Sequence, residues 1–136
     1  MTSRNNQELI AAALAARQNA HAPYSNFEVG AAVLGEDGGI WAGANVENAS
    51  FGLTMCAERV ALASAVSAGQ RRISRLAVAT PGGHAPCGGC RQFAAEFSDE
   101  MLVLLIDSQR PESVTEVALA ELLPMSFQYP DAPQRR

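Results

Sequence analysis

The stretch LTMCAERVALASAV, residues 53–66, forms an alanine-rich helical pattern with three reactive side chains at its start. Cys56, Glu58 and Arg59 fall within four positions there, whereas a helix that only had to pack would not need them. Residues two apart on a regular helix point in different directions, so Cys56 and Glu58 can share a site only if the helix begins at Cys56. The helix is therefore predicted to start there and to stop at Gly69, a natural left-handed end.

Around this helix the chain alternates helical and strand-like segments. A helix is predicted over residues 4–20, with Asn5 or Asn6 as its cap, and Asp37 with Gly38 marks a hairpin turn. Each strand-like run is too apolar to be exposed, so a sheet covered by helices on both faces is expected. The predicted strands are 27–35, 40–46, 73–80 and 101–107, and the other predicted helices are the second half of 87–97 and 117–123.

Length and charge exclude several classes of protein. The 136 residues suit one domain, predicted at 1–127, with a polar C-terminal tail at 128–136. The net charge of −4 and the scattered basic residues argue against a nucleic-acid partner. No apolar run approaches membrane-spanning length, and the polar N-terminus lacks a secretory signal. A cytoplasmic protein without a membrane or nucleic-acid partner is expected.

The three cysteines are the most informative part of the composition. They are Cys56, Cys87 and Cys90, an odd number that argues against a disulfide framework. The segment PCGGC contains a Cys-x-x-Cys pair in a glycine-rich turn, typical of a zinc site or of a thioredoxin-like redox pair. A redox pair would leave Cys56 without a role, so the third cysteine favours zinc.

The fourth zinc ligand decides what kind of site this is. His84, three residues before Cys87, would complete a closed structural site, whereas an open fourth position holding water is typical of catalysis. Glu58 favours the catalytic alternative, because a metal-bound water needs a proton shuttle and a structural site does not. Arg59, three positions from Cys56, can hydrogen-bond the thiolates and offset their negative charge.

The segments CAER and PCGGC also fit the signature of zinc deaminases, a Cys with Glu two residues later followed by Pro-Cys-x-x-Cys. With APYSNFEVGAAV, NVENASFGLT and ELLPMSF in order, the sequence resembles the small homotetrameric cytidine deaminases from about Tyr24 to Phe127. The resemblance implies a three-layer α/β/α cytidine deaminase-like fold with a mixed central sheet. It also implies one zinc per chain on Cys56, Cys87 and Cys90.

The resemblance implies further roles for single residues. Glu58 matches the catalytic proton shuttle and Arg59 the charge-compensating residue of the family. Asn45 and Glu47 of NVEN match the pair that binds the ribose hydroxyls, although without the resemblance NVEN would be an ordinary turn. The backbone of Ala57 matches a group that contacts the pyrimidine ring.

Two aromatic residues complete the implied substrate site. Phe27 and Phe127 match residues that line the base pocket, the latter reaching across from a neighbouring subunit. By residue type alone, both would be core residues.

The implied activity is the hydrolytic deamination of cytidine and 2′-deoxycytidine to the uridines, with release of ammonia, in pyrimidine salvage. One alternative is a deaminase of a modified cytosine nucleoside such as blasticidin S. The other is a non-catalytic structural zinc module.

Overall fold

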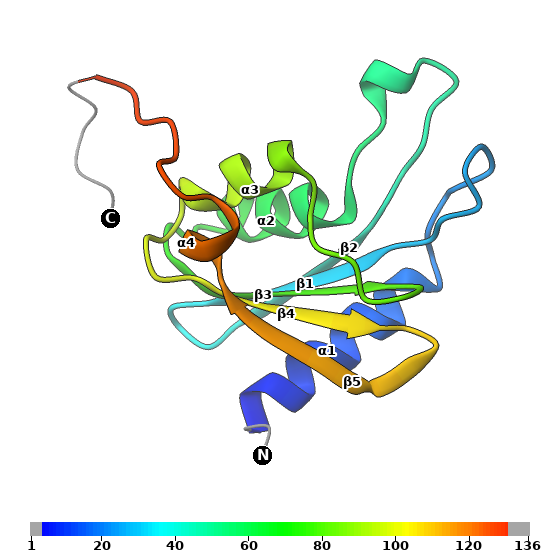
Figure 1. Cartoon of the computed structure of the whole chain (residues 1–136), viewed down its shortest axis with the longest axis horizontal. Coiled ribbons are helices and arrows are strands. Elements are labelled where there is room, and N and C mark those ends of the chain that lie inside the picture. The colour runs from blue at the N-terminus through cyan, green and yellow to red at the C-terminus, as the bar shows by residue number, and fades with distance from the viewer. Residues whose placement is uncertain (1–3, 131–136) are drawn as a thin grey trace.

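A five-stranded mixed sheet lies between two helical layers in the computed structural model, which describes residues 4–130 (Figure 1). The strand order is β2-β1-β3-β4-β5, and all neighbouring strands are antiparallel except the parallel pair β3 and β4. The predicted three-layer α/β/α fold with a mixed central sheet is confirmed. The elements are α1 (Arg4–Arg17), β1 (Gly30–Gly35), β2 (Ile40–Ala44), the 3₁₀ turn η1 (Phe51–Leu53), α2 (Ala57–Ser67), β3 (Ile73–Thr80), α3 (Gly88–Ala95), β4 (Leu102–Asp107), β5 (Arg110–Ala118) and α4 (Leu119–Leu122).

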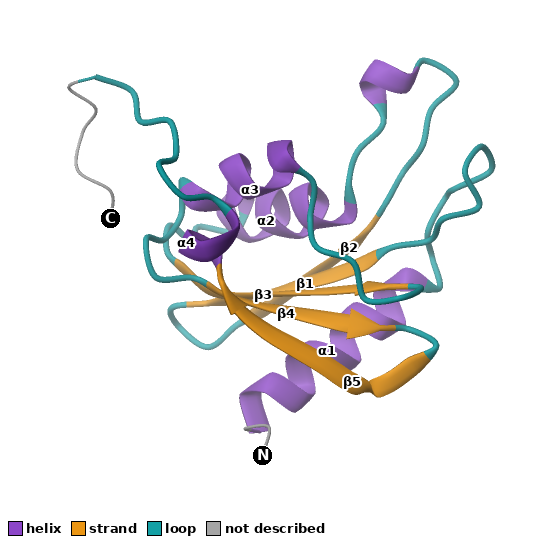
Figure 2. Ribbon diagram, viewed as in Figure 1, coloured by secondary structure: helices purple, strands orange, loops and turns teal. Residues whose placement is uncertain are grey.

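The central strands are buried on both faces, since α1 covers one face of the sheet and α2 with α3 covers the other (Figure 2). In β1, Ala31 and Val33 belong to the apolar core beneath α2 and α3. Ala32 and Leu34, which point the opposite way, belong to the core against α1. This two-sided burial explains why the strand reads as a continuous apolar run.

The hairpin of β1 and β2 turns where the sequence predicts. Gly38 has a φ of +91°, and the side chain of Asp37 accepts a hydrogen bond from the N–H of Gly39 at 2.8 Å. The strands pair from Gly30 opposite Ala44 at the open end of the hairpin. The residues before β1, predicted as part of the strand, instead form the loop that bears Phe27.

An edge strand at 110–118 is missing from the sequence prediction. The pattern predicts a helix over 117–123, but β5 includes its first two residues and α4 is limited to Leu119–Leu122. Val114 packs into the core against α1 and Val117 into the opposite core. Because only these two positions of the strand's interior are shielded, the usual period-two apolar pattern is absent.

The start of α1 also differs from prediction. The helix begins one residue before Asn5, so neither Asn5 nor Asn6 is its cap, and it ends three residues short of the predicted 20. Asn6 is instead buried under the sheet, where its Nδ2 donates to Glu116 Oε1 at 3.2 Å and its Oδ1 accepts from the Arg75 guanidinium. These bonds fix α1 to β5 and β3.

Residues 131–136 of the predicted tail lie outside the described part of the chain. Among the helices within residues 4–130, none has the length and apolar character needed to cross a membrane.

The close approach of α2 to β2 depends on Gly43. A Cβ at this position would lie 2.7 Å from Val60 Cγ1 and 2.8 Å from the backbone nitrogen of Ala61. The backbone nitrogen cannot rotate away, so a larger residue would displace the helix. A small residue on β2 therefore sets the position of α2.

Gly43→Ala is expected to lower the free energy of unfolding by about 1–3 kcal/mol, as overpacking typically does. Urea denaturation measures this change. Gly52→Ala is the matched control, because an added Cβ there meets nothing within 4 Å. Equal stabilities of the two variants would show that α2 does not depend on Gly43.

Candidate metal and substrate site

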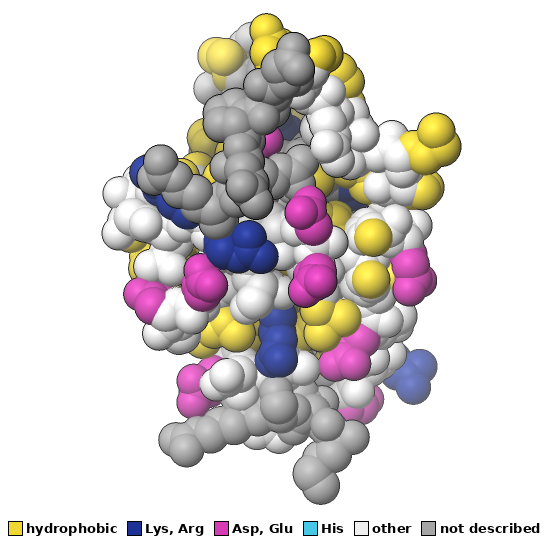
Figure 3. Space-filling view, turned by 90° about the vertical axis from the view of Figure 1, so that its left-hand side faces the viewer, with side chains coloured by type: hydrophobic (Ala, Val, Ile, Leu, Met, Phe, Trp, Pro, Cys, Tyr) yellow, Lys and Arg dark blue, Asp and Glu magenta, His cyan; other side chains and the backbone are white. Residues whose placement is uncertain are grey.

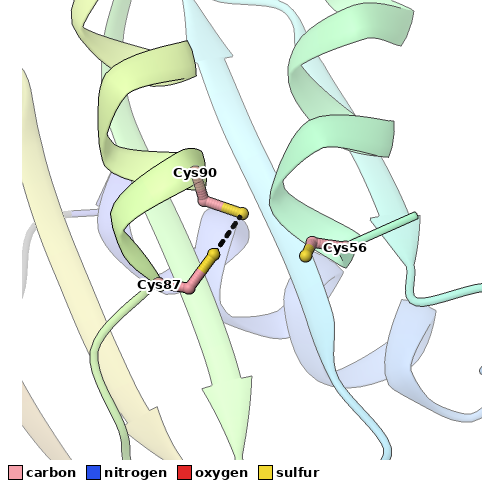
Figure 4. A group of neighbouring side chains, drawn as sticks. All are labelled: Cys56, Cys87 and Cys90. Carbon is pink, nitrogen blue, oxygen red and sulfur yellow. Dashed lines mark hydrogen bonds between the residues drawn. The ribbon is translucent and has the colours of Figure 1, made fainter. Parts of the chain in front are cut away.

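Three cysteine thiols meet where α2 and α3 begin (Figure 4). Cys56 caps α2, Cys87 caps α3, and Cys90 lies in the first turn of α3. Their sulfur atoms lie within 4.8 Å of one another, and the Cys87 and Cys90 sulfurs are 3.5 Å apart. The predicted start of the helix at Cys56 is confirmed, and the three cysteines come from two segments far apart in the sequence.

This set of donors fits zinc. Zinc binds thiolate sulfur at about 2.3 Å, so the sulfurs of a tetrahedral site stand about 3.8 Å apart. The three cysteines are free thiols at comparable separations. Three sulfur ligands leave one of four positions for water or substrate, which is the arrangement of catalytic zinc sites.

Hydrogen bonds govern the protonation of these thiols. A hydrogen bond from Cys90 lowers the pKa of Cys56 to about 5, and the Arg59 guanidinium adds to this against the effect of burial. The same contact raises the pKa of Cys90, whose buried thiol donates the proton. Zinc binds cysteine as thiolate, so an incoming ion displaces the protons of these thiols.

Arg59 makes the contact that its position in the sequence predicts. Its Nη2 donates to Cys56 Sγ at 3.3 Å. The positive charge of the guanidinium beside this sulfur offsets part of the negative charge that three thiolates bring to the site.

His84 lies outside the thiol cluster. Among the described residues, the group of metal-ligating atoms contains three sulfurs and no histidine nitrogen. The N–H of His84 donates to Thr80 Oγ1 at 2.7 Å, and its ring centroid lies 6.0 Å from that of Phe27. The alternative of a closed structural site with His84 as fourth ligand is therefore not formed in this arrangement.

Glu58 is a buried carboxyl in the first turn of α2, with 5% of its surface exposed. Burial raises its pKa, and the negative charge of Cys56 raises it further. A raised pKa suits a carboxyl that both accepts and returns a proton during a reaction. Ala57, between Cys56 and Glu58, is the first residue of α2, so its N–H has no partner within the helix.

Asn45 joins the end of β2 to the loop that bears Phe27. Its Oδ1 accepts the N–H of Val29 at 2.9 Å, and its Nδ2 donates to the carbonyl of Phe27 at 2.9 Å. Each of these amide atoms can make one more hydrogen bond. The side chain therefore has a role in the fold and retains capacity to bind a hydroxyl.

Glu47 lies in a pocket of about 330 Å³ that is also lined by Tyr24, Ser25, Phe51 and Thr54. The Ser25 hydroxyl lowers the pKa of Glu47, and the N–H groups of Tyr24 and Ser25 do the same. An ionised carboxylate in an open pocket can accept hydrogen bonds from two substrate hydroxyls. No substrate role is predicted from the sequence for the other four residues, because single side chains in loops produce no periodic pattern.

Phe27 and Phe127 are both exposed, at 38% and 68%, so the alternative that they are core residues is wrong. Phe27 is next to the pocket, since its N–H donates to Ser25 Oγ at 3.0 Å. Phe127 is not, because its carbonyl accepts from the Gln92 side chain on α3. Figure 1 shows the C-terminal segment and the loops around residues 25 and 50 at opposite ends of the molecule.

Comparisons with known proteins agree with this site. Residues 3–106 match the family described as "Cytidine and deoxycytidylate deaminase zinc-binding region". The chain is 45% identical to a cytidine deaminase of Halalkalibacterium halodurans, over 89% of this chain and 92% of the relative. It is 43% identical to one of Sporosarcina psychrophila, over 92% and 93% respectively.

Solved structures give the same result. The crystal structure of cytidine deaminase from Burkholderia pseudomallei superposes with a TM-score of 0.84 at 46% identity, covering 93% of this chain and all of that one. That of Mycobacterium tuberculosis gives a TM-score of 0.77 at 38% identity, covering 90% and 97%.

Cys87→Ala is expected to remove bound zinc and lower the melting temperature, because two thiolates hold the ion poorly. His84→Ala is expected to leave the zinc content unchanged, since its nitrogens lie outside the cluster. Elemental analysis of the purified variants gives zinc per chain. Loss of zinc from the His84 variant would support the closed structural site instead.

Proposed function

The chain belongs to the cytidine and deoxycytidylate deaminase family and is a zinc-dependent cytidine deaminase, and we propose that it converts cytidine and 2′-deoxycytidine to the uridines and ammonia. The observation that supports this most directly is the buried Glu58 beside a cluster of three thiols. A structural zinc module needs no such carboxyl. The three thiols would hold the ion.

Zinc, when bound, is a Lewis acid that brings the pKa of water to about 7. Glu58 accepts a proton from the attacking water as the oxygen bonds to C4 of the base, and it delivers this proton to ring N3. Glu58 then takes the proton of the new C4 hydroxyl and gives it to the exocyclic nitrogen. The C4–N bond breaks, ammonia leaves and the C4 carbonyl of uridine forms.

The substrate contacts follow from the loops around the site. The Glu47 carboxylate and the side-chain amide of Asn45, whose two atoms can each make one more hydrogen bond, bind the ribose hydroxyls. Both residues follow the end of β2. Phe27 lies against the base, and the unpaired N–H of Ala57 faces the pyrimidine. The proposed groups thus surround a nucleoside rather than a free base.

Glu58→Gln is expected to retain zinc and to fold. Its turnover is expected to fall by at least the roughly 10²–10⁴-fold that a general acid–base group typically contributes, because the amide cannot move protons. Turnover is followed by the loss of cytidine absorbance. Glu36→Gln, an exposed glutamate in the hairpin turn, is the control. Near-full turnover of the Glu58 variant would remove this residue from the mechanism.

The same assay on cytidine, 2′-deoxycytidine, cytosine, adenosine and blasticidin S tests the substrate assignment. Activity on cytidine and 2′-deoxycytidine, with little or none on cytosine, adenosine and blasticidin S, is expected. Equal activity on free cytosine would contradict the ribose contacts, and a preference for blasticidin S would favour the alternative deaminase.

We also propose that the protein is a homotetramer in which Phe127 enters a neighbour's site. The carbonyl of Phe127 is fixed to α3 at 3.1 Å from Gln92, and its ring is exposed. Met125 and Tyr129, in the same segment, are exposed too. Three apolar side chains held out from the surface suit contact with another copy of the chain.

The surface and the cysteines support a small-molecule substrate and a cytoplasmic location. On the side from which Figure 3 is viewed, basic and acidic side chains are interspersed, and apolar side chains gather at the upper end of the described part. An interspersed surface suits a small nucleoside better than a polyanion. Three free thiols suit a reducing compartment, so we place the enzyme in the cytoplasm.

Phe127→Ala is expected to raise the KM for cytidine about tenfold, because stacking of a base on an aromatic ring is worth about 1–3 kcal/mol. Zinc content is expected to stay unchanged. Glu36→Gln, in the exposed hairpin turn, is again the control. A fully active monomer in light scattering would contradict a shared site.

Mixing variants tests the sharing itself. Chains with Glu58→Gln keep Phe127, and chains with Phe127→Ala keep Glu58. Co-refolded mixtures are expected to exceed the summed activity of the separate variants, because some sites then combine both intact residues. Strict additivity would place Phe127 in its own chain's site.

A further inference from the structure

Ser25 lies between the carboxylate of Glu47 and the backbone of Phe27. Its hydroxyl donates its only proton to Glu47 Oε2 and accepts the N–H of Phe27 at 3.0 Å. Its own N–H donates to Glu47 Oε1 at 3.2 Å. One small side chain is therefore bonded at once to the carboxylate in the pocket and to the aromatic residue beside it.

The loop around Ser25 is fixed on both sides of this contact. Before it, the N–H of His21 donates to the Asn45 carbonyl at 2.9 Å, and the N–H of Glu47 donates to the His21 carbonyl at 2.8 Å. After it, the side chain of Asn45 binds the carbonyl of Phe27. The backbone between these anchors turns through Asn26, whose φ is +57°. Within residues 4–130, the Ser25 hydroxyl alone joins the tip of the loop to both the Glu47 carboxylate and the Phe27 amide.

We propose that Ser25 is a positioning residue that sets the Glu47 carboxylate and the Phe27 ring relative to each other, so that ribose and base are recognised together. This inference rests on the substrate roles proposed above for Glu47 and Phe27. Ser25 acts through these two residues, which accept from and donate to its hydroxyl.

Removing the hydroxyl has a defined consequence. Glu47 Oε2 loses its donor, and the N–H of Phe27 loses its acceptor. The backbone bonds to Oε1 remain, so Glu47 stays near the loop but can rotate about that oxygen. Binding of the substrate is weakened while the proton transfers at Glu58 are unchanged, which separates KM from kcat.

Ser25→Ala is expected to raise the KM for cytidine about tenfold, the effect of losing one hydrogen bond to a charged group, with kcat changed less than about twofold. Ser25→Thr, which keeps the hydroxyl, is expected to restore most of the affinity. Ser67→Ala, an exposed serine at the end of α2, is the control. Zinc content and melting temperature are measured for every variant.

A double-mutant cycle with Glu47→Ala distinguishes positioning from direct contact with substrate. If Ser25 acts through Glu47, the double variant loses clearly less in kcat/KM than the product of the two single losses. If the losses multiply, Ser25 acts independently of Glu47 and the inference is wrong. Should Ser25→Ala fail to fold, Ser25→Cys gives the same cycle, because a thiol is a weaker donor and acceptor.

The outcome is separable from that of the proposed function. Wild-type enzyme without activity on cytidine would overturn the function itself. Active wild-type enzyme with an unchanged KM in the Ser25→Ala variant would overturn only the role of Ser25. An equal loss in kcat would also overturn it, because positioning of substrate contacts predicts the change in KM.

Discussion

Three thiolates in one site repel one another, and the arrangement of this protein depends on how that repulsion is offset. Cys56 and Cys87 cap α2 and α3, so the positive ends of two helix dipoles face the sulfurs. Arg59 adds a full positive charge at 3.3 Å from Cys56. A divalent cation among the three sulfurs, which lie within 4.8 Å of one another, offsets the remaining negative charge. The sheet places the two helix starts side by side, because β2 and β3 both deliver the chain to the same end of the α2–α3 layer.

This arrangement separates chemistry from recognition. The thiols and Glu58 belong to helix starts that pack on a two-sided core, and Gly43 sets how closely α2 approaches it. The residues assigned to ribose and base lie on the loops around residues 25 and 47 and, for Phe127, on a segment at the opposite end of the molecule. In the proposed mechanism, rigid elements thus hold the proton-transfer geometry, while the loops bind the substrate.

The sequence was sufficient to predict those parts of the structure for which residue type and spacing have a direct physical meaning. The Cys-x-x-Cys pair, the cysteine two residues before Glu58 and the alternation of apolar segments predicted the thiol cluster and the layered fold. It was insufficient for β5, where only Val114 and Val117 are shielded, and for Asn6, which is a buried contact rather than a cap. Ser25 lies in the segment APYSNFEVGAAV but receives no role from the sequence, since its proposed role comes from two partners, one of them 22 residues away.

The coordination of the bound zinc tests the central claim most directly. X-ray absorption at the zinc edge of the metal-loaded enzyme gives the identity and distance of each ligand. Three sulfurs at about 2.3 Å and one exchangeable oxygen are expected, since three cysteines fill only three of four positions. A fourth ligand from the protein, such as a nitrogen of His84, would contradict it.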